Sequence, residues 1–298
     1  FDLFTFFAAF LSLLFLVLLE NEDEIMIQDP QWLNYVAQVR YCGGKAVRVP
    51  TDMDHNFEMQ PETIEALITP KTKALMINSP NNPTGSVMGK ETLEKIAEVA
   101  KKHNLLVISD EVYNTLLYGD EPYVSIASLP GMKERTVVVN SFSKSFAMTG
   151  WRIGYTAAPA HIVDRMTKCQ ENFNACANAP GQYAAAVALD HQDLCDELRD
   201  VFARRREILL QGLSEIEGIR CNHPTGAFYA FPDISSFGLS STEFCNRLLD
   251  EVGVVCIPGS AFGACGEGFI RICYTCGEED LREALARIRR FCDGLRKA

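Results

Sequence analysis

Basic residues are scarce in this sequence of 298 residues, where 28 Lys and Arg stand against 39 Asp and Glu and give a formal net charge of −11. The one basic cluster, Arg204–Arg206, falls in a helical pattern and is typical of a solvated helix face. This charge balance argues against a nucleic-acid partner. The sequence also has no internal repeat and no low-complexity linker.

Metal-ligand patterns are absent as well. The 5 histidines stand apart from one another, and of the 11 cysteines only Cys273 and Cys276 form a C-x-x-C pair. No second pair or histidine cluster completes a zinc site, so we expect no metal. The cysteine count is odd and the spacing irregular, which favours reduced, mostly buried thiols in a cytoplasmic protein over a disulfide framework.

What the sequence does contain is the material for a large core, since 47% of its residues are apolar and 22% are charged. Short apolar runs alternate with amphipathic segments in the first half, and this alternation predicts an α/β fold with a mainly parallel sheet covered by helices. The expected strands are Glu24–Gln28, Ala46–Val49, Ala74–Asn78, Leu105–Asp110 and Thr136–Asn140, and the clearest helix between them is Lys90–His103.

The pattern changes after residue 190. A long amphipathic helix is expected over Asp193–Ile216, followed by short strands at Ala227–Phe231, Val254–Ile257 and Phe269–Ile272 and a last helix from about Glu278. We therefore predict a large domain over residues 1–190 and a smaller α+β domain over residues 191–298.

The first residues are unusual, because every residue from Leu3 to Leu19 except Thr5 and Ser12 is apolar. This run could be a buried core helix that leads into the strand Glu24–Gln28, a membrane anchor at the lower limit of length, or a processed segment. We favour the buried helix and do not expect a membrane protein. A signal peptide would need a basic start, and no Lys or Arg precedes the run. The chain begins with Phe1, and a gene fragment is one explanation of this start.

Polar segments follow three of the expected strands. Ala74–Asn78 leads into Ser79–Gly85, Leu105–Ser109 into Asp110–Tyr113, and Thr136–Asn140 into Ser141–Lys144. Because ligands bind beyond the carboxyl ends of the strands in an open parallel sheet, these segments are expected to meet at one edge.

Lys144 is the central residue of this group. A lysine at the end of a buried strand enters a desolvated cleft, where its pKa can fall enough for the amine to act as a nucleophile. Ser141 and Arg152 lie close enough in sequence to hold a phosphate beside it. These residues suggest an aldehyde cofactor that carries a phosphate, and the alternative is a surface loop with an ordinary solvated lysine.

The motifs Asn81-Asn82-Pro83-Thr84-Gly85, Asp110-Glu111-Val112-Tyr113, Ser141-Phe142-Ser143-Lys144 and Gly150-Trp151-Arg152-Ile153-Gly154 occur in this order. Together with Pro258–Gly263 and Phe269–Ile272, they resemble the class I/II aminotransferases of the fold-type I pyridoxal-phosphate family. The resemblance covers roughly residue 20 to the end. It implies the large and small domains of that fold, pyridoxal 5′-phosphate as cofactor and a homodimer.

The resemblance also implies roles for single residues. Lys144 matches the lysine that forms the internal aldimine and moves the proton at Cα, Asp110 the carboxylate paired with the pyridine nitrogen, and Trp32 the aromatic residue stacked on the ring. Asn82 and Tyr113 match the hydrogen-bonding partners of the 3′-oxygen. Ser141, Ser143 and Arg152 match phosphate contacts, and Arg271, with Asn82, matches the site of the substrate α-carboxylate.

One part of the family pattern is missing. The glycine-containing phosphate loop and the start of its helix should fall near Phe6–Phe10, where this sequence has neither glycine nor a polar side chain. The arm that precedes it in the family, which packs on the neighbouring subunit, has no counterpart here. We therefore expect weakened cofactor binding and an effect on dimer formation and substrate selection.

The function predicted on this basis is that of an amino-acid aminotransferase, which passes an amino group from an amino acid to a 2-oxo acid in two half-reactions. Two alternatives remain open from the sequence. One is a related pyridoxal-phosphate C–S β-lyase that uses the same lysine, and the other is a non-catalytic remnant of the fold.

Overall fold

A seven-stranded sheet forms the larger part of the molecule, with the strand order β1-β7-β6-β5-β4-β2-β3. The computed structural model describes residues 2–5, 7–119 and 121–297 of the chain, with side chains from Phe10 onward. The strands are β1 (Asp2–Thr5), β2 (Glu24–Asp29), β3 (Lys45–Pro50), β4 (Thr72–Asn78), β5 (Leu106–Asp110), β6 (Thr136–Ser141) and β7 (Ile153–Ala157). Neighbours among β2 to β6 pair in parallel, while β7 runs antiparallel to both β6 and β1. The predicted mainly parallel α/β fold is confirmed.

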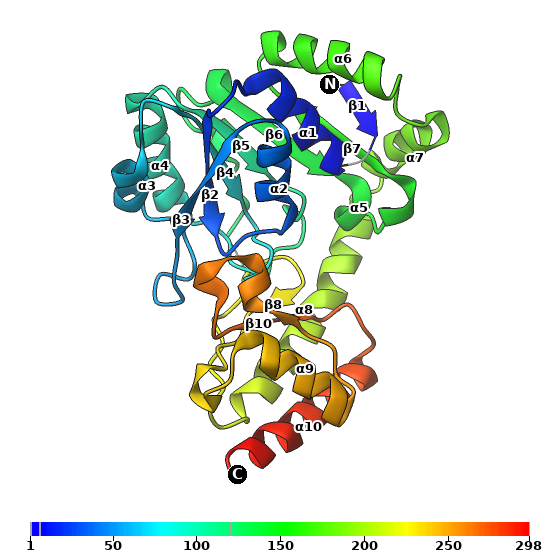
Figure 1. The fold of residues 1–298 in the computed structure, drawn as a ribbon. Helices are drawn as coiled ribbons and strands as arrows, with labels where there is room; N and C mark the ends of the chain where they lie inside the picture. The colour runs from blue at the N-terminus through cyan, green and yellow to red at the C-terminus, as the bar shows by residue number, and fades with distance from the viewer. Residues whose placement is uncertain (1, 6, 120, 298) are drawn as a thin grey trace.

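Helices cover both faces of this sheet (Figure 1). On one face α1 (Phe7–Leu18), α2 (Asn34–Tyr41) and α6 (Ala160–Phe173) share a hydrophobic cluster with the strands. On the other face α3 (Pro61–Leu67) and α4 (Lys90–Lys102) form a second cluster. The short α5 (Phe142–Ser145) continues from β6, and α7 (Ala179–Leu189) lies beside it near β7. The central strands carry uninterrupted apolar runs, such as Ala74–Ile77 in β4, because both of their faces are covered.

The N-terminal apolar run forms the strand β1 and the helix α1. Phe10, Leu11, Leu14 and Phe15 have no exposed surface, so α1 is a core helix that leads toward β2, as predicted. Within the described residues no helix is both long and apolar enough to cross a membrane. The strand β1 was not predicted, because the apolar run gives no sign of a break between a strand and a helix.

The rest of the chain forms a smaller part around an antiparallel three-stranded sheet of order β8-β10-β9, drawn below the large sheet in Figure 1. Its elements are α8 (Asp193–Ser214), β8 (Tyr229–Ala230), α9 (Ser241–Val252), β9 (Ile257–Pro258), β10 (Ile270–Cys273) and α10 (Glu278–Leu295). Short 3-10 helices complete the chain: η1 (Ile126–Ser128), η2 (Lys133–Arg135), η3 (Thr149–Trp151), η4 (Ser235–Phe237), η5 (Gly259–Phe262) and η6 (Ala264–Gly266). The predicted boundary near residue 190 falls between α7 and α8, and the division into two domains stays a prediction.

The two sheets meet at the carboxyl ends of the parallel strands. The buried Asp29 carboxylate at the end of β2 accepts hydrogen bonds from the backbone N–H groups of Ala264 and Cys265, at 3.2 and 3.3 Å. Gly85 adopts a φ of +70°, and a Cβ there would lie 2.4 Å from the carbonyl oxygen of Tyr229, so only glycine permits this approach of the two parts. The small sheet is thereby held directly over the edge where the polar segments end.

Candidate active site

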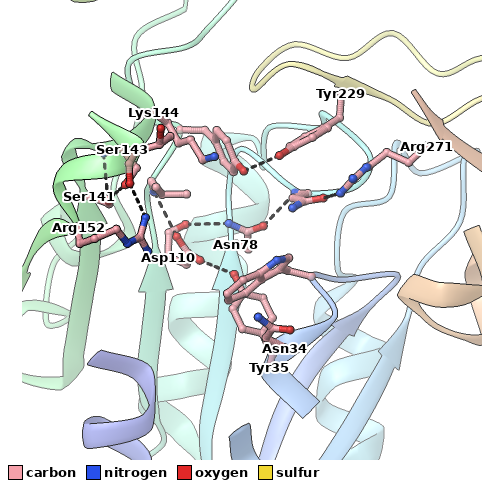
Figure 2. Close-up of a pocket in the computed structure, with 15 residues that line it drawn as sticks. Asn34, Tyr35, Asn78, Asp110, Ser141, Ser143, Lys144, Arg152, Tyr229 and Arg271 are labelled. Carbon is pink, nitrogen blue, oxygen red and sulfur yellow. Dashed lines mark hydrogen bonds between the residues drawn. The ribbon is translucent and has the colours of Figure 1, made fainter. Parts of the chain in front are cut away.

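A cavity of about 370 Å³ lies at this edge, a size typical of small-ligand pockets (Figure 2). All the site residues predicted from the sequence line it, namely Trp32, Asn82, Asp110, Tyr113, Ser141, Ser143, Lys144, Arg152 and Arg271. Most of them come from the ends of β4, β5 and β6, whereas Arg271 comes from β10 of the small sheet. The expected convergence on one edge is confirmed. The roles of the single residues stay predictions.

Lys144 lies in the single helical turn of α5, directly after β6. Its ammonium group lies 5.4 Å from the ring centre of Phe228 and is half-buried. Burial lowers the pKa of Lys144, and the nearby charges of Arg152 and Arg271 act in the same direction, while Cys273 opposes them. More of this amine is therefore neutral at a given pH than in a solvated lysine, which suits a nucleophile.

Asp110 ends β5 at the bottom of the cavity, with 1% of its surface exposed. Its carboxylate accepts hydrogen bonds from the Tyr35 hydroxyl and, at 3.2 Å, from the backbone N–H of Val112. Burial raises the pKa of Asp110 to about 7, although the Tyr35 hydrogen bond lowers it. A carboxylate in such a place gains strongly from a cationic partner.

Two asparagines that follow from the end of β4 connect the backbone of Asp110 with Arg271 on the far side of the cavity. The Asn78 side-chain amide donates to the Asp110 carbonyl at 3.3 Å, and its oxygen accepts from the backbone N–H of Asn82 at 2.9 Å. The Asn82 side-chain oxygen in turn accepts a hydrogen bond of 3.0 Å from Nη1 of Arg271. Asn78 thus fixes the position of Asn82 from below.

Ser141, Ser143 and Arg152 gather on the side of the cavity next to β7 (Figure 2). Ser141 caps α5, since its hydroxyl accepts from the Ser143 backbone N–H at 3.1 Å, and the two hydroxyls lie 2.9 Å apart. Arg152 has a left-handed φ of 57° and donates from Nη1 to the Thr149 carbonyl at 2.6 Å. Two hydroxyls and a guanidinium in one place are suited to bind a phosphate.

Arg271 is held between aromatic rings on the opposite side. Its guanidinium carbon lies 4.8 Å from the ring centre of Tyr229 and 4.9 Å from that of Phe262. Its Nε is buried and has no hydrogen-bond partner among the described residues. The planar group is therefore fixed in orientation with donor capacity left for a carboxylate.

Trp32 follows β2 and forms the wall of the cavity nearest α2. Its ring is half-buried and meets the Tyr35 ring edge-on, with ring centres 5.2 Å apart. It thus lines the cavity beside the phenol that donates to Asp110.

The sequence did not reveal several further residues of this cavity, namely Asn34, Tyr35, Asn78, Val112, Thr149 and Tyr229. Asn78 had a usable signal, since it is the last residue of a predicted strand. Tyr35 and Tyr229 had none, because their roles depend on which side chains the fold brings near them.

The expected phosphate loop concerns residues 6–10. A helix does start there, at Phe7, and the fully buried Phe10 packs close to Gly154 and so to the β7 side of the cavity. Phe6 lies outside the described residues, as do the side chains of residues 7–9. The expected weakening of cofactor binding stays a prediction.

Comparison with known proteins agrees with this geometry. The family model for aminotransferase class I and II matches residues 7–288. The chain is 46% identical over 275 residues to an aspartate aminotransferase of Pyrococcus abyssi, covering 91% of this chain and 70% of that protein. It is 44% identical over 275 residues to aromatic-amino-acid aminotransferase 2 of Thermococcus litoralis, with 91% of this chain and 70% of that protein covered.

A solved structure is similar over nearly the whole chain. The aromatic aminotransferase from Pyrococcus horikoshii superposes with a TM-score of 0.96 at 41% identity, covering 99% of this chain and 80% of that one.

Proposed function

The chain belongs to the class I and II aminotransferase family and is an amino-acid aminotransferase, and from this premise we propose that it works with pyridoxal 5′-phosphate bound in the cavity at Lys144. The observation that carries the proposal is the meeting of Lys144, Asp110 and Arg271, from two different sheets, at one cavity.

The residues present fit this cofactor at both of its ends. Ser141, Ser143 and Arg152 offer hydroxyls and a guanidinium for the phosphate. Asp110, whose pKa burial raises to about 7, offers a buried carboxylate for a protonated ring nitrogen. Because the attraction between these charges is strong at a buried site, Asp110 would keep the nitrogen protonated.

Lys144 supplies the amine that holds the aldehyde and moves the proton at the substrate Cα. When bound, the cofactor supplies an electron-withdrawing ring that accepts the electron pair left at Cα. Trp32 lines the face where the ring would lie, and Asn82 and Tyr113 offer hydrogen bonds to its 3′-oxygen.

Arg271 binds the α-carboxylate shared by the amino acid and the 2-oxo acid. Its buried Nε without a partner in the described part of the chain, and its fixed plane between Tyr229 and Phe262, support this role. A guanidinium whose plane is held by two rings presents its donors to a carboxylate with little loss of side-chain entropy.

A homodimer is part of the proposal. The segment from the end of α6 through α7 exposes large apolar side chains, with Phe173 67%, Tyr183 78% and Val187 60% exposed. An apolar patch of this kind on a monomer is typical of an interface, and a second copy of the chain is the proposed partner. The cytoplasm is the proposed location, in line with the many thiols that the structure leaves unpaired.

The test is spectroscopic and kinetic. The purified chain mixed with pyridoxal phosphate is expected to develop a visible absorption band that Lys144→Ala abolishes. Addition of an amino acid alone should then bleach the band and release one equivalent of 2-oxo acid. A band that does not depend on Lys144 would contradict the proposal. Release of pyruvate and ammonia from a β-substituted amino acid, in place of transamination, would favour the β-lyase.

A further inference from the structure

Two phenols of the cavity form a pair that the proposed function does not explain. The hydroxyls of Tyr113 and Tyr229 lie 2.9 Å apart, within hydrogen-bond distance, and join the large sheet to the small one. Both side chains are buried, with 4% and 6% of their surface exposed. Among the described residues neither hydroxyl has another hydrogen-bond partner.

Counting protons limits what this pair can do. Each phenol has one proton, so only one of the two can donate within the pair. If Tyr113 donated to Tyr229, it would have no proton left for a ligand. If Tyr229 donates to Tyr113, the proton of Tyr113 remains available to the cavity.

The surroundings of the two rings favour Tyr229 as the donor. The guanidinium of Arg271 lies 4.8 Å from the centre of the Tyr229 ring. Burial raises the pKa of Tyr229 to about 12, but the hydrogen bond with Tyr113 and the charge of Arg271 both lower it. Burial also raises the pKa of Tyr113, as do Tyr229 and Asp110, while the charge of Arg271 lowers it. Because the guanidinium that lies against the Tyr229 ring draws electron density from its phenol, Tyr229 is the better donor of the two.

We propose that Tyr229 is a positioning residue, whose hydroxyl donates to Tyr113 and so directs and strengthens the Tyr113 hydroxyl as a donor to the 3′-oxygen of the bound cofactor. This inference rests on the proposed function. The effect follows from cooperativity, because a hydroxyl that accepts one hydrogen bond becomes a stronger donor in the next.

The pH dependence of the visible band of the loaded enzyme tests the proposal. Donation to the 3′-oxygen stabilises its negative charge and so weakens its hold on the proton shared with the neighbouring Lys144 nitrogen. Tyr229→Phe is therefore expected to raise the midpoint pH of the band by roughly half a unit, which corresponds to part of one hydrogen bond. An unchanged midpoint would overturn the proposal.

A double substitution separates action through Tyr113 from a general disturbance. Tyr113→Phe alone should shift the midpoint upward by more than Tyr229→Phe, and adding Tyr229→Phe to it should give no further shift. A further shift of the same size in the Tyr113→Phe background would show that Tyr229 acts independently, and would overturn the proposal.

Tyr118→Phe is the matched control. Tyr118 is another buried phenol of the same hydrophobic cluster, donates to the carbonyl of Ala227 and does not line the cavity. The Tyr118→Phe variant should leave the midpoint pH of the visible band unchanged while lowering thermal stability about as much as Tyr229→Phe does. If Tyr118→Phe shifted the midpoint pH as much as Tyr229→Phe does, repacking of the hydrophobic cluster would explain the effect, and the inference would be refuted.

A comparison of Tyr229→Leu with Tyr229→Phe separates the effect of the hydroxyl from the effect of the ring. Tyr229→Phe keeps a ring against Arg271, so KM for the amino acid should change less than about twofold, whereas Tyr229→Leu removes the ring and should raise KM several-fold. If the unchanged chain forms no Lys144-dependent band, the proposed function fails and this inference with it. If the band forms but Tyr229→Phe does not move its midpoint, only this inference fails.

Discussion

The buried Asp110 that the proposed reaction uses as a carboxylate makes the ligand-free chain less stable once it ionises. In the ligand-free folded chain it keeps its proton up to a pH of about 7, because burial raises its pKa. An unfolded chain loses that proton near a pH of about 3.9. Between these two values unfolding releases a proton, so the stability of the ligand-free protein falls as the pH rises. The loss is of the order of 4 kcal/mol once the pH exceeds the folded value.

Asp110→Asn removes this ionisation. The ligand-free variant is expected to unfold at higher urea than the unchanged chain at pH 8, with the difference shrinking as the pH falls from 7 toward 4. Urea denaturation across this range measures it, with Asp164→Asn on the exposed face of α6 as the control. The same gain in stability at pH 4 and pH 8 would contradict the assigned pKa.

Arg271 allows a second prediction. Replacing it with lysine keeps the charge but loses the planar fork and the contact with two rings. Arg271→Lys should raise KM for both the amino acid and the 2-oxo acid by roughly 10- to 100-fold. Steady-state kinetics with each substrate in turn checks this. The control is Arg289→Lys, in an exposed ion pair with Glu215, which should leave both KM values unchanged. An effect of Arg271→Lys on the KM of one substrate alone would argue against a shared carboxylate site.

The sequence predicted which residues meet at the cavity where strand ends carried them. Asn82, Asp110 and Lys144 lie at or just after the ends of strands with apolar runs, and parallel strands bring their ends together. Tyr229 escaped prediction because its hydrogen bond with Tyr113 spans 116 positions in the chain. Such a contact leaves no local pattern.

The helix α1 is the element whose interpretation was most open from the sequence. Because its side chains are buried, shortening one of them should lower the free energy of unfolding strongly, since a Leu→Ala change in a core costs about 2–5 kcal/mol. Leu14→Ala, at a position with 0% exposure, should lower the free energy of unfolding by that amount, whereas Leu16→Ala, at 47% exposure, should cost less than about 1 kcal/mol. Urea denaturation of both variants decides. Equal costs would mean that α1 is not packed as the structure has it.

The five strands expected in the first half of the chain were all found, including β3, whose apolar run Arg48 interrupts. The strands β2, β4 and β6 were placed to within two residues at either end. The strand β7 was missed because Gly154 and Thr156 interrupt its apolar pattern. The structure requires the glycine, since a Cβ on Gly154 would lie 2.6 Å from the Asn140 carbonyl oxygen of the neighbouring strand. The strand expected at Val254–Ile257 begins before the observed β9, Ile257–Pro258, because Pro258 ends the pattern that identifies a strand.

The molecule as a whole is predicted to associate through α7. Val187→Glu places a charge on the exposed apolar face of this helix, at a position that is 60% exposed. It should weaken the dimer at least tenfold, as measured by light scattering over a dilution series. Val255→Glu, at a 71% exposed position on the small part, is the matched control and should leave the mass unchanged. Equal masses for all three proteins would contradict the proposed interface.

The cavity lies between two sheets that contribute different kinds of residue. Asp110 ends β5 of the large sheet and Lys144 follows its strand β6, whereas Tyr229 and Arg271 stand on β8 and β10 of the small one. Substitutions on β10 around Arg271 can therefore alter how tightly the carboxylate common to all substrates is held without replacing Lys144 or Asp110. For natural selection, and equally for a protein engineer, β10 is the strand on which the affinity for substrates can change while the groups that move the proton are kept.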